Sequence, residues 1–169
     1  MKHTNVQKIT FAGVIAALYV VLTYIANLAG LASGVIQVRL SEALTILPLF
    51  TPSAVPGLFV GCILANIITG CAPWDVVFGS LATLIGAVGT YLIARSKLPQ
   101  VAKEWTAPLP PILSNTVIVP WVLVYVYGAT EGIPFLMLTV GLGEVISAGI
   151  LGIILYMALK PSARRIFNN

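Results

Sequence analysis

Apolar stretches separated by short polar segments fill almost the whole chain. Four of them, over residues 9–29, 76–94, 107–127 and 133–159, reach about the 20 residues that a helix needs to cross the apolar core of a membrane. Two shorter stretches, 39–50 and 56–70, lie between the first and the second long ones. The pattern therefore predicts an all-α integral membrane protein with six transmembrane helices over these six ranges.

The two shorter predicted helices cannot cross a bilayer upright with lipid on all sides. Irregular backbone at membrane depth must be surrounded by protein or line a cavity, because its amides and carbonyls need hydrogen-bond partners. We therefore expect the 39–50 and 56–70 helices to pack among the longer ones, with their ends lining a cavity. The sequence contains no internal repeat, and residues 1–169 are expected to form a single transmembrane domain.

The composition excludes most classes of soluble protein. Of the 169 residues, 59% are hydrophobic and 8% are charged, whereas charged residues make up roughly 25% of an ordinary soluble domain. A soluble fold cannot hide so much apolar surface. This excludes a cytosolic enzyme, a nucleic-acid-binding module and a disordered linker, and it indicates a chain whose surroundings are membrane lipid.

Positive charge is distributed unevenly between the predicted loops. Six helices place both tails on the same side of the membrane as the segments 51–55 and 95–105. That side carries eight of the nine basic residues, namely Lys2, Lys8, Arg95, Lys97, Lys103, Lys160, Arg164 and Arg165. Cytoplasmic loops are enriched in Lys and Arg. We therefore expect both termini to be cytoplasmic, with the loops 30–38, 71–75 and 128–132 facing outward.

Polar side chains within the predicted helices gather toward the outer side. Such groups are costly in a membrane, and their positions are therefore informative. The outer set comprises Asn27, Gln37, Arg39, Glu42, Asn66, Trp74 and Asp75, while Asn115 and Glu144 lie near the middle of the membrane. Most of the inner half is apolar. The arrangement predicts a polar cup that opens outward and is closed inward, as in a receptor and unlike a channel.

Each acidic candidate has two interpretations. Glu144 either contacts a ligand or pairs with Arg39 or an amide, because a carboxylate at that depth must be protonated or paired. Glu42 follows Arg39 by three residues, so it either binds a ligand or forms an ion pair along one helical face. Asp75 stands just before the predicted 76–94 helix, where it either caps that helix or faces a ligand.

The amide and aromatic candidates are equally open to two interpretations. Asn66 and Asn115 either form hydrogen bonds between helices or contact a ligand. Trp74, Trp121 and Tyr125 lie near the predicted outer interface, where aromatic side chains anchor membrane helices. Any of the three is also able to stack on a ligand ring.

Motifs for catalysis and for cofactor binding are missing from the sequence. There is no phosphate-binding G-x-x-x-x-G-K-[ST] loop, and the only histidine, His3, lies in the N-terminal tail. Cys62 and Cys71 are too few for a metal site and are expected to be packing thiols. We therefore expect no metal, no cofactor and no enzymatic activity in this chain.

Small residues at helical spacing mark surfaces where helices approach closely. Residues 9–29 contain the pair Ala12 and Ala16 and, one step round the helix, the pair Gly13 and Ala17. Residues 56–70 contain a Gly-x-x-x-Gly pair at 57 and 61. The pairs on the first helix lie near the cytoplasmic side, where a partner protein is able to dock.

Several of these residues fall in a pattern that resembles a known family. The specific run is residues 37–50, QVRLSEALTILPLF, and it is followed by matches at 56–61, Asn66, Trp74–Asp75, 78–87, 111–115 and Gly143–Glu144. The chain resembles the QueT-type queuosine-precursor transporters over nearly its whole length. That family comprises the substrate-binding S-components of energy-coupling-factor (ECF) transporters of the bacterial plasma membrane.

The resemblance implies six helices, cytoplasmic termini and a ligand pocket near the outer face. It also implies three partner chains, namely a transmembrane coupling protein and two ATP-binding subunits. By position, Ala12 and Ala16 match the small-residue motif with which the family docks on the coupling protein. The implied mechanism is toppling, in which the loaded S-component rotates in the membrane and carries its pocket to the cytoplasm.

The implied substrate is a 7-deazaguanine such as preQ1 or preQ0, or alternatively queuine. Glu144 or Glu42 is then expected to accept the two donors of the guanine-like edge. Asn66 or Asn115 would donate to the ring carbonyl, Trp74, Trp121 or Tyr125 would cover a ring face, and Glu42 or Asp75 would hold a protonated aminomethyl group. Gln37 and Arg39 complete the expected binding set. The alternatives are an S-component for another small vitamin-like molecule and a structural membrane protein.

Overall fold

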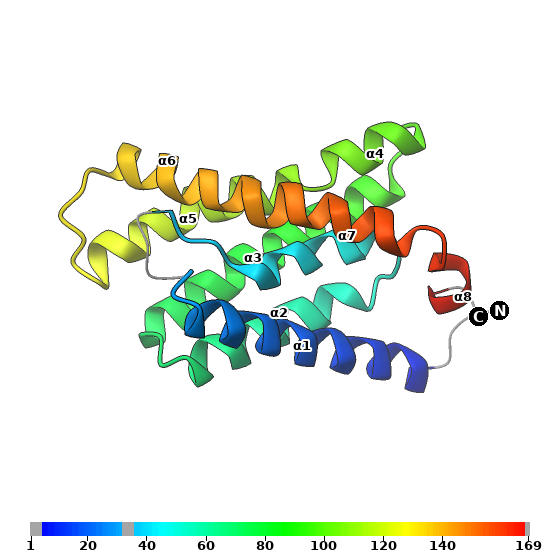
Figure 1. Cartoon of the computed structure of the whole chain (residues 1–169), viewed down its shortest axis with the longest axis horizontal. Helices are drawn as coiled ribbons and strands as arrows, with labels where there is room; N and C mark the ends of the chain where they lie inside the picture. Colours follow the sequence, from blue (N-terminus) through cyan, green and yellow to red (C-terminus); the bar gives the residue numbers. More distant parts are fainter. Residues whose placement is uncertain (1–4, 32–35, 168–169) are drawn as a thin grey trace.

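The computed structural model describes residues 5–31 and 36–167, and all the regular structure in these two ranges is helical (Figure 1). Lys2 and His3 of the tail, together with residues 32–35 of the predicted 30–38 loop, lie outside the described residues. In chain order the elements are α1 (Asn5–Leu28), the 3₁₀ helix η1 (Leu40–Leu49), α2 (Ala54–Ile68), α3 (Pro73–Arg95), α4 (Gln100–Thr106), α5 (Leu109–Tyr125), α6 (Ile133–Glu144), the π-helical segment η2 (Val145–Leu151), α7 (Gly152–Leu159) and α8 (Ala163–Phe167).

The predicted long helices are confirmed as helices, with shifted ends. In the described part of the chain, four helical stretches are long and apolar enough to cross a membrane: Asn5–Leu28, Pro73–Arg95, Gln100–Tyr125 and Ile133–Leu159. The two shorter apolar helices are also present, as Leu40–Leu49 and Ala54–Ile68. Proline stands at or beside the start of α3, α4, α5 and α6, where its missing N–H leaves no intrahelical bond unmade.

Two segments differ from the sequence prediction. The 95–105 region, expected to be a loop, contains the short helix α4, which is tied to the end of α3 by a hydrogen bond from the Lys103 amine to the Ala94 carbonyl at 2.8 Å. The 39–50 helix is a 3₁₀ helix rather than an α-helix. Pro48 lacks an N–H, and the Thr45 hydroxyl donates to the Glu42 carbonyl at 2.6 Å, so regular α-helical bonding is interrupted there.

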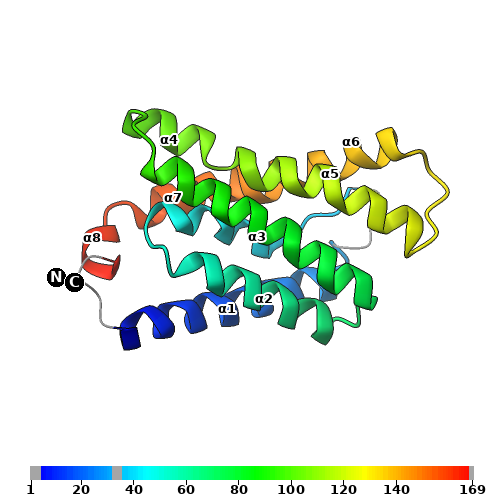
Figure 2. The ribbon, with the colours of Figure 1, turned by 180° about the vertical axis from the view of Figure 1, so that it is seen from behind.

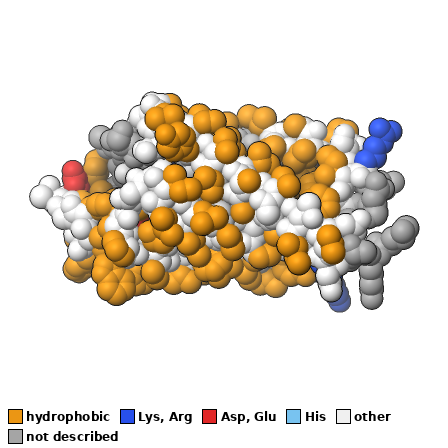
Figure 3. Space-filling model, turned by 90° about the horizontal axis from the view of Figure 1, so that it is seen from below, with side chains coloured by type: hydrophobic (Ala, Val, Ile, Leu, Met, Phe, Trp, Pro, Cys, Tyr) orange, Lys and Arg blue, Asp and Glu red, His pale blue; other side chains and the backbone are white. Residues whose placement is uncertain are grey.

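The long helices lie side by side along one axis, and the buried η1 runs among them (Figures 1 and 2). Residues 41–48 of η1 are all buried, although they include Ser41 and Glu42. The start of α1 and the C-terminal α8 lie at the same end of the bundle, which we call the tail end (Figure 1). Apolar side chains cover the middle of the face seen in Figure 3, while the charged side chains visible there lie toward the ends.

A buried carboxylate joins three elements at the centre of the bundle. Glu42 of η1 has no exposed surface, and its Oε1 atom accepts hydrogen bonds from the hydroxyls of Tyr19 on α1 and Thr83 on α3, the latter at 3.2 Å. Nearby, the Thr23 hydroxyl donates to Ser41 at 2.8 Å. Hydrogen bonds of this kind satisfy polar groups that lipid cannot hydrate. They also fix η1 against α1 and α3.

The first helix packs against α2 through small residues. A Cβ added at Gly57 would lie 2.7 Å from the Ala12 carbonyl oxygen, and one added at Gly61 would lie 2.9 Å from the Ala16 Cα. Ala16 is 7% exposed. Ala12 and Ala16 therefore face α2 inside the chain, which does not support the expectation that they form a free docking face. The neighbouring Gly13 is open, since nothing lies within 4 Å of a Cβ built on it.

This contact predicts opposite effects for one substitution at two glycines. Both Gly61→Ala and Gly13→Ala raise intrinsic helix propensity by about 1 kcal/mol. In Gly61→Ala the new methyl group meets the Ala16 backbone, and overpacking of this kind costs about 1–3 kcal/mol. In detergent, we expect the apparent melting temperature to fall in Gly61→Ala and to stay level or rise in Gly13→Ala. Equal melting temperatures in the two variants would contradict the close α1–α2 contact.

Candidate functional site

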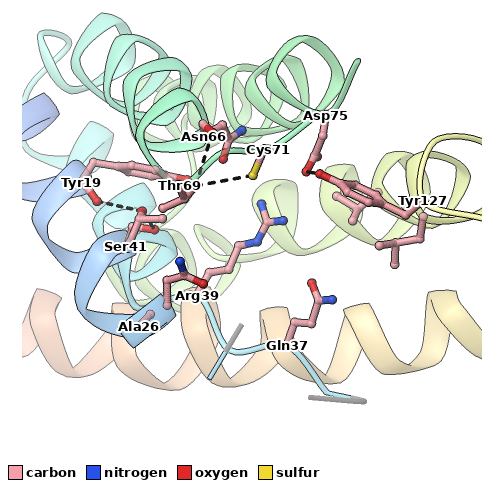
Figure 4. A pocket seen from close by; sticks show the side chains of 14 residues that line it. Tyr19, Ala26, Gln37, Arg39, Ser41, Asn66, Thr69, Cys71, Asp75 and Tyr127 are labelled. Atoms are coloured by element: carbon pink, nitrogen blue, oxygen red, sulfur yellow. Dashed lines mark hydrogen bonds between the residues drawn. The ribbon is translucent and has the colours of Figure 1, made fainter. Parts of the chain in front are cut away.

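A cavity of about 470 Å³ lies toward the end of the bundle opposite the tail end. Figure 4 shows the side chains that line it. Its walls come from the C-terminal halves of α1, α2 and α5, the start of α3 and the extended segment ahead of η1. The lining residues are Tyr19, Thr23, Ala26, Asn27, Gln37, Arg39, Ser41, Asn66, Thr69, Cys71, Asp75, Val119, Leu123 and Tyr127. The structure thus brings together the predicted residues Asn27, Gln37, Arg39, Asn66 and Asp75.

Arg39 enters the cavity from an extended backbone just before η1. Its backbone N–H donates to the Ser147 hydroxyl of η2 at 3.1 Å, which anchors the segment from behind. The guanidinium points into the open space (Figure 4). Among the described residues the ion pair that forms is Lys160–Glu104 at the tail end, so Arg39 pairs with neither Glu42 nor Glu144. The interpretation of Glu42 or Glu144 as an ion-pair partner of Arg39 is therefore wrong, while pairing of Glu144 with an amide stays a prediction.

Gly143 of α6 allows the extended segment to lie where it does. A Cβ built on Gly143 would collide with the backbone carbonyl of Gln37. A residue with no side chain is therefore required behind this wall of the cavity. Gln37 and Arg39 of this segment line the cavity, whereas Glu144, which follows Gly143, does not.

Asp75 lies in the first turn of α3 and is 5% exposed. The Tyr127 hydroxyl donates to Asp75 Oδ2 at 2.9 Å, and the Ala72 N–H donates to the same hydroxyl at 3.1 Å. Partial burial, together with the neighbouring carboxylate, raises the pKa of Tyr127 to about 12, so the phenol keeps the proton that it donates. The N-cap position before α3 is occupied by Ala72, and no side chain caps the helix. The capping interpretation of Asp75 is therefore wrong.

Asn66 and Asp75 meet over a glycine of α3. A Cβ added at Gly79 would lie 3.2 Å from Asp75 Oδ1 and 3.3 Å from Asn66 Nδ2. The missing side chain at Gly79 leaves room for both polar groups on the same wall of the cavity. Asn66 is 4% exposed, and its amide nitrogen lies 3.7 Å from the Cys62 sulfur. An amide and a carboxylate are thus adjacent, and each has unused hydrogen-bonding capacity.

Glu42, Asn115 and Glu144 lie outside the cavity lining. Tyr19 lines the cavity, and its hydroxyl donates a hydrogen bond to Glu42, which does not line the cavity. Asn115 donates to the Pro111 carbonyl of its own helix at 3.1 Å, so this bond does not connect two helices. Glu144 is 5% exposed, and its Oε2 atom has no hydrogen-bond partner among the described residues. The structure leaves Glu144 as a buried polar group beside the site rather than in it.

The predicted aromatic residues Trp74 and Trp121 face away from the polar cavity. They are 62% and 45% exposed and line an apolar groove between α3 and α5. The Trp121 ring stacks on Tyr125 with a centroid distance of 6.0 Å, and the Trp74 ring stacks on Phe78 at 6.1 Å. Exposed stacked aromatics on apolar helices favour the anchoring interpretation of these residues.

Sequence reasoning missed several residues of the lining. Tyr19 and Thr23 lie within the longest apolar run of α1, where nothing in the pattern sets them apart, and Tyr127 meets Asp75 only because the ends of α3 and α5 lie together. Thr69 and Cys71, by contrast, stand close to Asn66 and Asp75 in the chain, a signal that would have found them. No group of three or more His, Cys, Asp or Glu residues in the described ranges is arranged to hold a metal ion.

Comparison with known proteins identifies the family. The model of the family described as QueT transporter matches residues 9–161. The chain is 33% identical over 99 residues to the queuosine precursor transporter QueT of Lactococcus lactis subsp. cremoris (strain MG1363), an alignment that covers 57% of each chain. The chain thus aligns with little more than half of that relative. No solved structure matches the chain.

The match to the family extends over most of the chain, and the described residues include several long apolar helices. The resemblance seen in residues 37–50 is therefore confirmed at the level of the family. The chain belongs to the QueT transporter family and is a multi-pass protein of the bacterial membrane.

Proposed function

We propose that this chain is the substrate-binding component of an importer for a queuosine precursor, and that the polar cavity is its binding site. The observation that carries the proposal is a cavity at one end of the bundle into which Arg39, Asn66 and Asp75 all present polar atoms. Its volume of about 470 Å³ lies in the range of small-molecule sites, about 300–1,000 Å³. The printed name of the Lactococcus relative supports the choice of ligand.

A 7-deazaguanine matches the chemistry of this lining. The Arg39 guanidinium donates to the ring carbonyl, and the side-chain amides of Gln37 and Asn66 offer both donors and acceptors to the guanine-like edge. Tyr19 closes the inner end of the cavity with an aromatic ring whose position is held by Glu42. In this proposal Glu42 does not contact the ligand but holds Tyr19 in place through their hydrogen bond. Glu144, Asn115, Trp74 and Trp121 have no contact with the ligand.

We place the cavity on the outer side of the membrane. The tail end of the bundle carries Lys8 at the start of α1, and it carries Arg95, Lys103 and Lys160 at the ends of α3, α4 and α7. The positive-inside rule assigns such an end to the cytoplasm. Six helices, with η1 and α2 as the two short ones, then give cytoplasmic termini and a cavity open to the outside.

Import then requires energy from other chains. We propose that the protein works as an ECF S-component, with a membrane coupling protein and two ATP-binding subunits, and that toppling delivers the ligand inward. Because Ala12 and Ala16 face α2, we assign docking on the coupling protein to the next face of α1, where Gly13 and Ala17 are exposed. A helix is able to approach closely along such a face.

Ligand binding is tested by thermal unfolding of the purified chain in detergent. A ligand that binds only the folded state at 100 times its Kd stabilises it by about 2.7 kcal/mol, so preQ1 or preQ0 is expected to raise the melting temperature. Asn66→Leu removes two hydrogen-bonding atoms from the cavity and should abolish most of the shift. Trp121→Leu, on the groove outside the cavity, should preserve it. If folded protein responds to a panel of vitamins and to neither deazaguanine, the substrate assignment is wrong.

The docking assignment is tested with a bulky residue on the exposed face of α1. Gly13→Leu should reduce uptake of labelled ligand in cells that contain the ECF module by about tenfold or more, since about 1.4 kcal/mol of lost association is enough for that. Binding to the purified chain should be unchanged. Val14→Leu, at a position 53% exposed on the same helix, is the matched control. Normal uptake in Gly13→Leu would exclude this face as the docking surface.

A further inference from the structure

We propose that the cavity selects a ligand that carries a protonated amine, and that Asp75, oriented by Tyr127, is the residue that binds this cation. The inference rests on the proposed function and deepens it, because it distinguishes one class of deazaguanine from another. Among deazaguanines with the same ring, it favours preQ1, which has an aminomethyl arm, over preQ0, which has an uncharged nitrile.

The Asp75 carboxylate is held on one side and available on the other. Its Oδ2 atom accepts the Tyr127 hydroxyl at 2.9 Å. Its Oδ1 atom lies against α3 beside Gly79, 3.2 Å from where a Cβ of that residue would stand. Figure 4 shows the carboxylate at the wall of the cavity with the Tyr127 ring beside it. Asp75 lines the cavity, and the hydrogen bond from Tyr127 occupies one of its two carboxylate oxygens.

The opposite charge in the cavity does not neutralise Asp75. Arg39 and Asp75 line the same cavity. No ion pair joins the two within 4.0 Å in the part of the chain that the structure describes. Two opposite charges therefore face one cavity without meeting. A ligand with a positive arm at one end and a hydrogen-bond acceptor at the other fits between them.

The energetic consequence is a preference for a charged arm. Asp75 is 5% exposed, and a ligand that fills the cavity removes its remaining water. A neutral arm then leaves the carboxylate oxygen without a partner, whereas an ammonium group provides a charge-assisted hydrogen bond. Sites with a buried polar group discriminate strongly against ligands that cannot pair with it. The ring contacts of Arg39, Gln37 and Asn66 are the same for both ligands and do not contribute to the preference.

The test measures the Kd values of preQ1 and preQ0 by titration calorimetry on the full chain, in wild type and variants. A hydrogen bond to a charged group is worth about 1.5–3 kcal/mol, which corresponds to about 10- to 150-fold in affinity. We expect wild type to bind preQ1 at least about tenfold more tightly than preQ0. Asp75→Asn should weaken preQ1 by about the same factor and change preQ0 by less than about threefold.

Two further variants keep the result interpretable. Glu131→Gln removes an exposed acid near the same end of the bundle but outside this cavity, and both affinities should be unchanged. Tyr127→Phe keeps the carboxylate but removes the hydroxyl that orients it. Tyr127→Phe should reduce the preference for preQ1 over preQ0. This variant therefore tests the inference even if Asp75→Asn does not fold.

Each outcome bears on the inference separately from the proposed function. Equal wild-type affinities for the two ligands would show that the cavity does not select the amine. An equal loss of both affinities in Asp75→Asn would show that Asp75 does not act on the arm. Either result would overturn the inference while the proposed function stands. If neither deazaguanine binds to folded wild-type protein, the proposed function fails and the inference fails with it. A selective loss of preQ1 in Asp75→Asn supports both.

Discussion

The hydrogen bonds on the Glu42 carboxylate are the contact on which the rest of the architecture depends. Lipid provides no hydrogen-bond partners, so a polar segment at membrane depth persists only where the protein satisfies it. Tyr19 of α1 and Thr83 of α3 do this for the Oε1 atom of Glu42, whereas its buried Oε2 atom has no hydrogen-bond partner among the described residues. The 3₁₀ helix η1 is thereby held inside the bundle, and the extended residues before it, including Arg39, are brought to the cavity.

The cavity follows from close packing behind its walls. Gly143 admits the backbone of Gln37, and Gly79 leaves space for Asn66 and Asp75. The lining then presents an arginine and an aspartate that do not pair with each other among the described residues. An unpaired charge is costly to desolvate, and this explains why such a lining suits a polar, dipolar ligand better than an apolar one. The groove lined by Trp74 and Trp121 is apolar and lies on the surface of the bundle, between α3 and α5.

The sequence predicted the helices and part of the cavity well, because hydropathy and charge act locally. Apolar run length located the long helices, and polar residues near helix ends located Gln37, Arg39, Asn66 and Asp75. Contacts between distant segments were not accessible. Nothing local shows that Ala12 and Ala16 face α2, that Glu144 is absent from the cavity lining, or that Tyr127 reaches Asp75. The polar residues of α4 predict a loop, because short helices without an apolar face carry no hydropathy signal.

The central claim is that the ligand occupies the cavity bounded by α1, α2, α3 and α5, and the native cysteines test it directly. Cys71 lines this cavity, whereas Cys62 is fully buried. The decisive measurement is the rate at which a small maleimide modifies Cys71 in folded protein, with and without saturating preQ1. If the ligand occupies this cavity, preQ1 slows the reaction at Cys71. If preQ1 stabilises the protein while Cys71 reacts at an unchanged rate, the ligand binds elsewhere and the cavity is not the binding site.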